Sequence, residues 1–130
     1  MNRTHLEGAA EKLTAQRGYT FYTGPEDDMG HTVRNYPAAW LAPPELHAVE
    51  GRTHGRATYD MTLHLLRPGA RISPAERRTA LAEMEAQMIE IFAELSLDER
   101  ILAVEGLSVR SLTPHGEISQ TATARIVTWF

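Results

Sequence analysis

Imidazole and carboxylate groups that could bind a metal ion gather in two stretches of this sequence. In chain order they are Glu26, Asp27, Asp28, His31, His47, Glu50, His54, Asp60 and His64. Zinc ligands must converge about 2 Å from one point, usually through short spacings on a turn or helix. Here a predicted strand turn separates His47 from His54, and about 13 Å of predicted strand separates Asp60 from His64. We therefore expect surface histidines and no metal, with a metal-dependent enzyme built on His31, His47 and His54 as one alternative.

The residue types and motifs of nucleophilic catalysis are scarce. The chain has no cysteine, which removes disulfides, thiolate nucleophiles and cysteine-ligated metal centres. It has no Gly-x-Ser-x-Gly motif, and Lys12 lies in an alanine-rich predicted helix that offers no activating neighbour. The stretch "GRTHGR" does not match the glycine patterns that bind phosphate. The sequence therefore predicts neither an enzyme nor a bound cofactor.

The charge balance points away from nucleic acid. The 130 residues include 13 basic and 17 acidic side chains, which gives a net charge of −4. Nonspecific nucleic-acid binding usually needs a basic excess. We expect no direct nucleic-acid specificity. The alternative is a local basic patch around the start of the long helix, drawn from Arg52, Arg56, Arg67, Arg71, Arg77 and Arg78. No signal-peptide core and no stretch of ~18 apolar residues is present, so we expect a cytoplasmic protein without a membrane span.

The basic residues are almost all arginines, because Lys12 is the only lysine. Arginine makes planar, bidentate contacts that suit protein interfaces, and a GC-rich coding sequence would produce the same bias. The first explanation makes exposed arginines part of a candidate interaction surface, together with nearby aromatic residues. That surface comprises Tyr36, Trp40, Arg77, Arg78, Arg125 and Trp129.

The aromatic members of this surface have structural interpretations as well. In "YPAAWLAPPEL", residues 36–46, Pro37 favours an extended Tyr36, and the prolines at 43 and 44 end a short strand. We expect Trp40 to lie in or beside the core, against the helix layer; a binding role for Tyr36 and Trp40 is the alternative. Trp129 and Phe130 should point to opposite faces of the last strand, either as a core anchor or as a surface for a neighbouring subunit.

Hydrophobic periodicity places these residues on the elements of one domain, residues 1–130. Thr4 and Glu7 form a predicted capping box for a short helix over 5–16. Ser73 is the predicted N-cap of a 22-residue amphipathic helix ending at Leu95. Strands are predicted over 19–23, 38–42, 46–51, 55–66, 101–112 and 117–130, with a turn at 113–116 and a long polar loop at 24–35. This order predicts an α+β fold: an antiparallel sheet with both helices packed on one face.

The layout resembles the small tail terminator and tail-completion (neck) proteins of long-tailed phages and prophages. The likeness is carried by "YPAAWLAPP", "GRATYDMTLHLL", "SPAERRTALAEMEAQMIEIFAEL" and the final "TARIVTWF". It implies a structural protein of the virion, found in the cytoplasm before assembly. It also implies a homo-oligomeric ring, usually a hexamer, that caps the tail tube and meets the head–tail connector. The 24–35 loop would then order on contact with a neighbour. A small ligand- or protein-binding domain using Tyr36 and Trp40 is the alternative.

Overall fold

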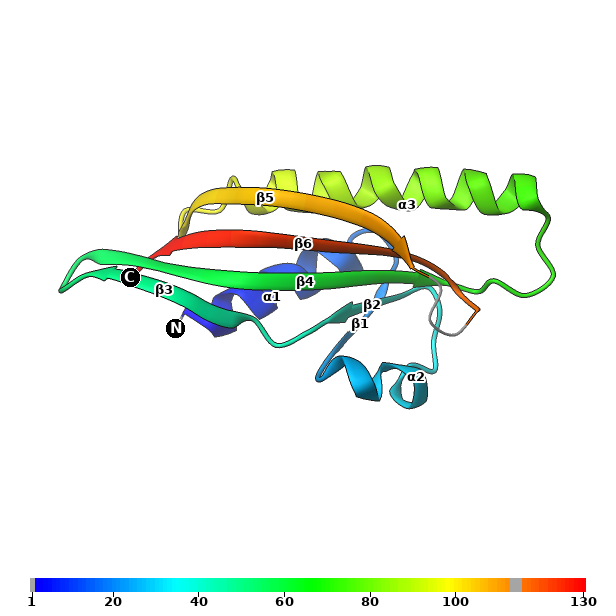
Figure 1. The fold of residues 1–130 in the computed structure, drawn as a ribbon, viewed down its shortest axis with the longest axis horizontal. Helices are drawn as coiled ribbons and strands as arrows, with labels where there is room; N and C mark the ends of the chain where they lie inside the picture. The colour runs from blue at the N-terminus through cyan, green and yellow to red at the C-terminus, as the bar shows by residue number, and fades with distance from the viewer. Residues whose placement is uncertain (1, 113–115) are drawn as a thin grey trace.

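A computed structural model describes residues 2–112 and 116–130 (Figure 1). In chain order the elements are α1 (Asn2–Ala15), β1 (Thr20–Thr23), the 3-10 segment η1 (Glu26–Asp28), α2 (Met29–Thr32), β2 (Ala38–Leu41), β3 (Glu45–Gly51), β4 (Gly55–Arg67), α3 (Pro74–Leu95), β5 (Ile101–Leu112) and β6 (Ile118–Trp129). The predicted α+β class, with a long and a short helix beside a sheet, is confirmed. The predicted turn at 113–116 lies, except for its last residue, outside the described residues.

The strands of the described chain form one sheet, with β4 at its centre. The hydrogen-bonded order is β1-β2-β4-β6-β5, and β3 also pairs with β4. β6 runs along the whole length of β4, whereas β2 and β3 share its other side, one beyond the other. All pairs are antiparallel except β1 and β2, which are parallel. The wholly antiparallel prediction is wrong at this point, because the 24–35 segment returns the chain to the end where β1 began.

The main core lies between the sheet and the two longer helices. Strand alternation in β4 and β6 sends Met61, Leu63 and Ile126 to this side, as the sequence predicted. The stripe on α3 is also as predicted, with Met84, Met88, Ile91 and Leu95 buried. Ser73 caps α3 by accepting a hydrogen bond from the Glu76 N–H at 3.1 Å. Full burial of such side chains stabilises the fold by about 1.5–3 kcal/mol each.

The start of α1 differs from the predicted capping box. Thr4 lies inside the helix, which already begins at Asn2. The Asn2 side-chain amide donates hydrogen bonds of 2.8 Å to Thr128 Oγ1 and to the Trp129 carbonyl. These contacts with the distant end of β6 anchor the first turn of the helix, so no local cap is needed at Thr4.

A second, smaller core lies on the opposite side of the sheet. We call residues 24–35 the cover, because this segment, with η1 and α2, packs over one corner of that side (Figure 1). Its Met29 and Val33 are buried with Trp40 and Leu66. Trp40 is therefore in the interior as expected, but the predicted packing against the helix layer is wrong. The cover also packs on the sheet of its own chain, whereas a loop that orders on contact with a neighbour was expected.

Candidate functional site

The structure separates most of the histidines and acids that the sequence offered as metal ligands. His47 Nδ1 lies 3.4 Å from Asp60 Oδ2, and His31 Nε2 lies 3.9 Å from Asp28 Oδ1. Within residues 2–112 and 116–130, no three histidine, cysteine, aspartate or glutamate side chains are grouped closely enough to hold a metal ion. These two pairs are single histidine–carboxylate contacts at the surface.

His64 is the exception to the expected surface histidines, because it is buried with 4% of its side chain exposed. Its Nε2 lies 2.8 Å from Glu26 Oε2 of the cover, and its Nδ1 lies 2.8 Å from Thr121 Oγ1 of β6. A carboxylate only accepts hydrogen bonds, so Nε2 must carry a proton, and in the neutral imidazole Nδ1 then accepts from the threonine hydroxyl. His64 thus ties the cover to the sheet. Sequence reasoning missed it because alternation identifies a face without showing what covers that face.

Trp40 and Tyr22 hold the two ends of the cover. Their rings stack with centroids 6.2 Å apart, and Trp40 Nε1 donates a 2.9 Å hydrogen bond to the Gly24 carbonyl. The Tyr22 hydroxyl accepts hydrogen bonds from the N–H groups of Arg34 and Asn35, which lower the pKa of Tyr22. Trp40 therefore lies beneath its own chain and cannot meet a partner while the cover is closed.

The remaining residues of the proposed interaction surface do not lie together. Arg77 and Arg78 are in the first turns of α3, at the opposite end of the molecule from the β3–β4 turn with Arg52 and Arg56 (Figure 1). Arg52 and Arg56 therefore do not contribute to the suggested basic patch around the start of α3. Tyr36 is half-exposed just before the start of β2.

Arg125 and Trp129 share the side of the sheet opposite α1 and α3, which we call the open face. Arg125 Nε donates to Asp60 Oδ1 at 3.3 Å. The Arg56 guanidinium lies 5.9 Å from the centre of the Trp129 ring, a cation–π contact. Of the proposed surface, the structure thus places only these two residues on a common, accessible face.

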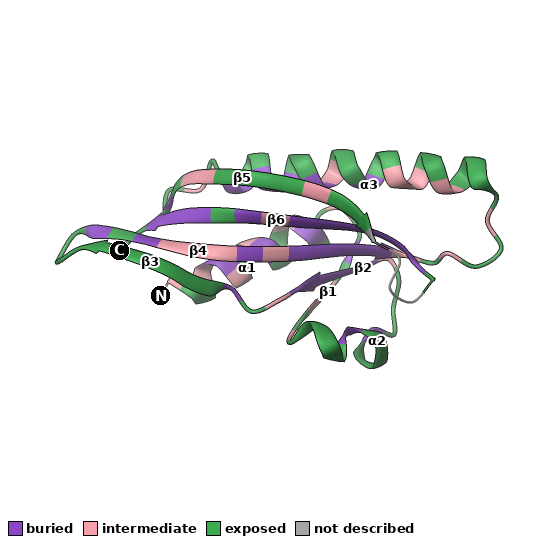
Figure 2. Ribbon diagram, viewed as in Figure 1, coloured by how far each residue is buried: buried purple, intermediate pink, exposed green. Residues whose placement is uncertain are grey.

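A group of exposed apolar residues lies where the sheet projects past its helices. We call residues 45–60, with the paired chain end 129–130, the arm. Every residue of β3 is exposed, which Figure 2 shows as a continuous green strand. Leu46 and Val49 have 51% and 55% of their surface exposed, and Phe130 has 45%. The sequence showed a strand here but not its exposure, because no local pattern tells where the helix layer ends.

The register places these apolar side chains on one side of the arm. Leu46 pairs with Tyr59, Val49 pairs with Ala57, and Phe130 makes two backbone hydrogen bonds with Gly55. Directly paired residues share a face, here the same face as the main core. Unlike the main core, these side chains are not covered by a helix in the described structure and meet solvent.

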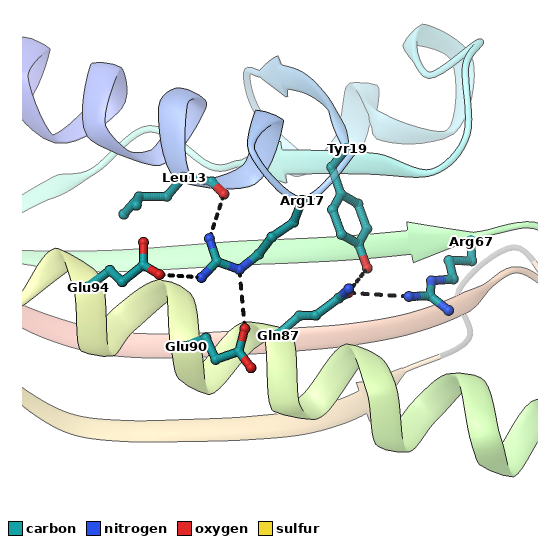
Figure 3. A network of polar contacts seen from close by, with 7 residues as sticks. All are labelled: Leu13, Arg17, Tyr19, Arg67, Gln87, Glu90 and Glu94. Atoms are coloured by element: carbon teal, nitrogen blue, oxygen red, sulfur yellow. Dashed lines mark hydrogen bonds and ion pairs between the residues drawn. The ribbon is translucent and has the colours of Figure 1, made fainter.

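Arg17 connects α1 to α3 through the polar network of Figure 3. Its guanidinium donates to the Leu13 carbonyl at 3.0 Å and to Glu94 Oε1 at 2.6 Å, and its Nε lies 3.5 Å from Glu90 Oε2. The contact to Leu13 satisfies a free carbonyl at the end of α1. Arg17 therefore acts as a C-terminal cap that also binds the neighbouring helix.

Tyr19, Gln87 and Arg67 continue the network toward β4 (Figure 3). The Tyr19 hydroxyl donates to Gln87 Oε1 at 2.5 Å, and Arg67 Nη2 donates to the same oxygen at 3.3 Å. Burial raises the pKa of Tyr19, although the neighbouring Arg67 opposes this. The hydroxyl therefore stays protonated and keeps donating, so this network is a structural brace.

An open groove of about 820 Å³ runs between the outer side of α1 and the end of α3 with the turn that follows it. His5 and Asp98 form part of its wall, with His5 Nε2 2.7 Å from Asp98 Oδ2. Partial burial raises the pKa of Asp98. Hydrogen bonds from the Arg100 N–H, at 2.8 Å, and from His5 outweigh that effect and hold this pKa below its usual value of 3.8.

The lowered pKa of Asp98 predicts a loss of stability in acid. Because the folded chain binds this proton less readily than the unfolded chain, the stabilisation is present above about pH 4 and is lost as the pH falls through the folded pKa. Asp98→Asn should lower the free energy of unfolding by about 1–2 kcal/mol at pH 7. The difference from wild type should shrink toward pH 3 in urea titrations. Glu99→Gln removes one exposed carboxylate, so this variant should lose stability in acid as the wild type does. If Glu99→Gln and Asp98→Asn lowered the free energy of unfolding equally, the stabilising role of Asp98 would be contradicted.

No protein-family model matches the chain, and no curated protein matches it in sequence. None of the helices in the described parts of the chain is long and apolar enough to cross a membrane.

Proposed function

We propose that this chain is a structural subunit that self-associates through its arm, as a tail-terminator-like ring protein of a phage or prophage. The observation that carries the proposal is the gathering of four apolar residues at one end of the sheet, each at least 45% exposed. Leu46, Val49 and Phe130 are on the core side of the arm, and Trp129 is on its open face. Monomeric proteins rarely expose neighbouring large apolar side chains unless the surface binds something. These residues come from two strands and the chain end, so the surface is built by the fold.

The other long sheet edge fits a partner less well. β5 has two register shifts, between Ile101 and Ala103 and between Glu105 and Ser108, whereas β3 has one, between Leu46 and Ala48. Bulges and exposed charges such as Glu105 and Arg110 are the devices by which edge strands avoid pairing with other chains. The arm is therefore the better candidate for the contact between subunits.

A ring follows if the arm meets a different surface on the next copy. Such a head-to-tail contact closes when the rotation per subunit divides a full circle, and otherwise gives an open filament. The resemblance of the layout to tail terminators adds the partners: a tail tube on one side of the ring and a head–tail connector on the other. In this proposal the protein is cytoplasmic until it is built into a virion.

Light scattering coupled to size exclusion, over a wide range of protein concentration, tests the proposal. We expect a species of about six times the 14.5 kDa subunit mass, or a ladder toward it. Negative-stain microscopy of that fraction should show closed rings. A strict monomer at every concentration would contradict self-association and favour a monomeric binding domain, with the half-exposed Tyr36 as the first residue to mutate.

A further inference from the structure

The groove between α1 and the end of α3 has two basic side chains that form no ion pair within the described residues. Its two acids are engaged: Glu94 by Arg17 at 2.6 Å and Asp98 by His5 at 2.7 Å. Lys12 and Arg100, which also line it, form no ion pair within the described residues. The groove therefore presents two cations to whatever enters it.

The groove also carries apolar surface. Leu97, at its rim, is 82% exposed, the largest exposed fraction of any large apolar residue described in the chain. Ala9 and Leu13 form the apolar part of the α1 wall. A matching occupant would thus be a narrow segment with apolar side chains and two free carboxylates.

β3 has this composition. Leu46 and Val49 point to one side of the arm, and Glu45 and Glu50 pair with Asp60 and Arg56 on the other side. Neither glutamate lies within ion-pair distance of a basic group in the part of the chain that the structure describes. A strand that enters a groove edge-first touches both walls. Each wall here carries one cation beside apolar side chains: Lys12 with Ala9 and Leu13 on α1, and Arg100 with Leu97 in the segment after α3.

The lengths agree as well. From Thr4 to Gln16 the α1 wall extends about 18 Å, at about 1.5 Å per residue. From Glu45 to Glu50 the strand extends about 17 Å, at about 3.3 Å per residue. The outer edge of β3 has no strand beside it in the described sheet, so the backbone leaves room for such an approach.

We infer that β3 of one copy docks edge-first into the α1–α3 groove of a second copy, with Glu45 and Glu50 facing Lys12 and Arg100. The inference rests on the proposed self-association and names the two surfaces that meet. They are different surfaces of one chain, so the contact is head-to-tail, as a ring requires. β3 and the elements that form the groove both lie toward the side of the molecule where the C-terminus lies (Figure 1). Each copy must therefore be rotated relative to the copy that it contacts.

A complementation experiment tests the docking. The arm variant L46D/V49D keeps an intact groove, and the groove variant K12E/R100E keeps an intact arm. Each alone should be a monomer, with its apparent dissociation constant raised at least tenfold. Mixed in equal amounts, they should form a two-subunit complex and nothing larger, because only one of the two possible contacts remains intact. The control variants I89D and R78E carry matched changes at other exposed positions of α3 and should assemble as the wild type does.

The outcomes separate the two proposals. If the groove variant assembles like the wild type while the arm variant is monomeric, or if the mixture stays monomeric, the docking is overturned while self-association through the arm stands. If the arm variant also assembles like the wild type, the arm is not the contact surface and both proposals are overturned. A wild type that is monomeric at every concentration overturns both. Circular dichroism confirms that each variant is folded; should one unfold, the milder pair L46T/V49T and K12Q/R100Q gives the same readout.

Discussion

Replacing Trp40 by alanine is expected to lower the free energy of unfolding by about 3–5 kcal/mol, as for other large buried aromatic residues. The indole fills the small core under the cover, stacks on Tyr22 and holds the Gly24 carbonyl through its Nε1. Trp40→Phe keeps a ring in this space but loses that hydrogen bond, so its expected cost is smaller, about 1–2 kcal/mol. Urea unfolding followed by circular dichroism measures both.

The same substitution should open the cover. Arg34 is exposed within it, so tryptic cleavage after Arg34 reports opening. We expect faster cleavage there in Trp40→Ala, with cleavage after Arg78 in α3 rising less. Trp129→Ala is the matched control, because it removes the same side chain from a half-exposed position and should cost about 1 kcal/mol. Equal losses in the two tryptophan variants would contradict the placement of Trp40 in a core of its own.

Gly55→Ala should disrupt the arm and, with it, assembly. A methyl group at this position would lie 2.0 Å from the Glu50 carbonyl oxygen and 2.8 Å from the Phe130 ring. The backbone of β3 must then move, which costs about 1–3 kcal/mol and separates β3 and the chain end from β4. Hydrogen exchange of the arm amides should accelerate roughly tenfold or more, and oligomers should be lost at concentrations where the wild type assembles.

Gly8→Ala is the control for this change. Gly8 lies within α1, and an added methyl group there meets no atom within 4 Å. Alanine is the better helix former, so this variant should be more stable than the wild type by about 0.5–1 kcal/mol. If Gly55→Ala behaved in the same way, the close packing of the arm would be refuted.

The cover limits what this corner of the sheet can bind. It closes over Trp40 through contacts with β1, β2 and β4, and it leaves most of its own polar side chains in water. Four of the nine large apolar residues that are exposed in the described chain lie instead at the arm, at the far end of β4: Leu46, Val49, Trp129 and Phe130. A docking surface at the arm therefore agrees with the distribution of exposed apolar area, whereas a site at Trp40 would first require the cover to open.

Local patterns predicted α3 and β4 well, because the residues that define each element lie within it or next to it. In α3, Ser73 and Pro74 define the start, and Met84, Met88 and Ile91 recur at helical spacing. In β4, strict alternation placed Met61 and Leu63 on the core side. Burial and capping within one element depend on residues a few positions apart, so the sequence contains the information directly.

His64, Trp40 and β3 show what local patterns do not predict, namely which side chains a distant segment covers. Alternation placed His64 and Trp40 correctly on strands, but the cover that buries them comes from a different part of the chain. The start of α1 is similar, since Asn2 is anchored by Thr128, at the far end of the sequence. No spacing rule connects residues so distant.

The sequence by itself determined the class of fold, the longer helices and strands, and the inward side of α3, β4 and β6, because periodicity and end signals act over a few residues. Only the tertiary structure decided which outward side is covered and which is left open. That outcome depends on where the chain leads after each strand: the cover reaches Trp40, while Leu46 and Val49 are left exposed. The candidate surface, Leu46 and Val49 beside the chain end, is therefore a property of the assembled sheet.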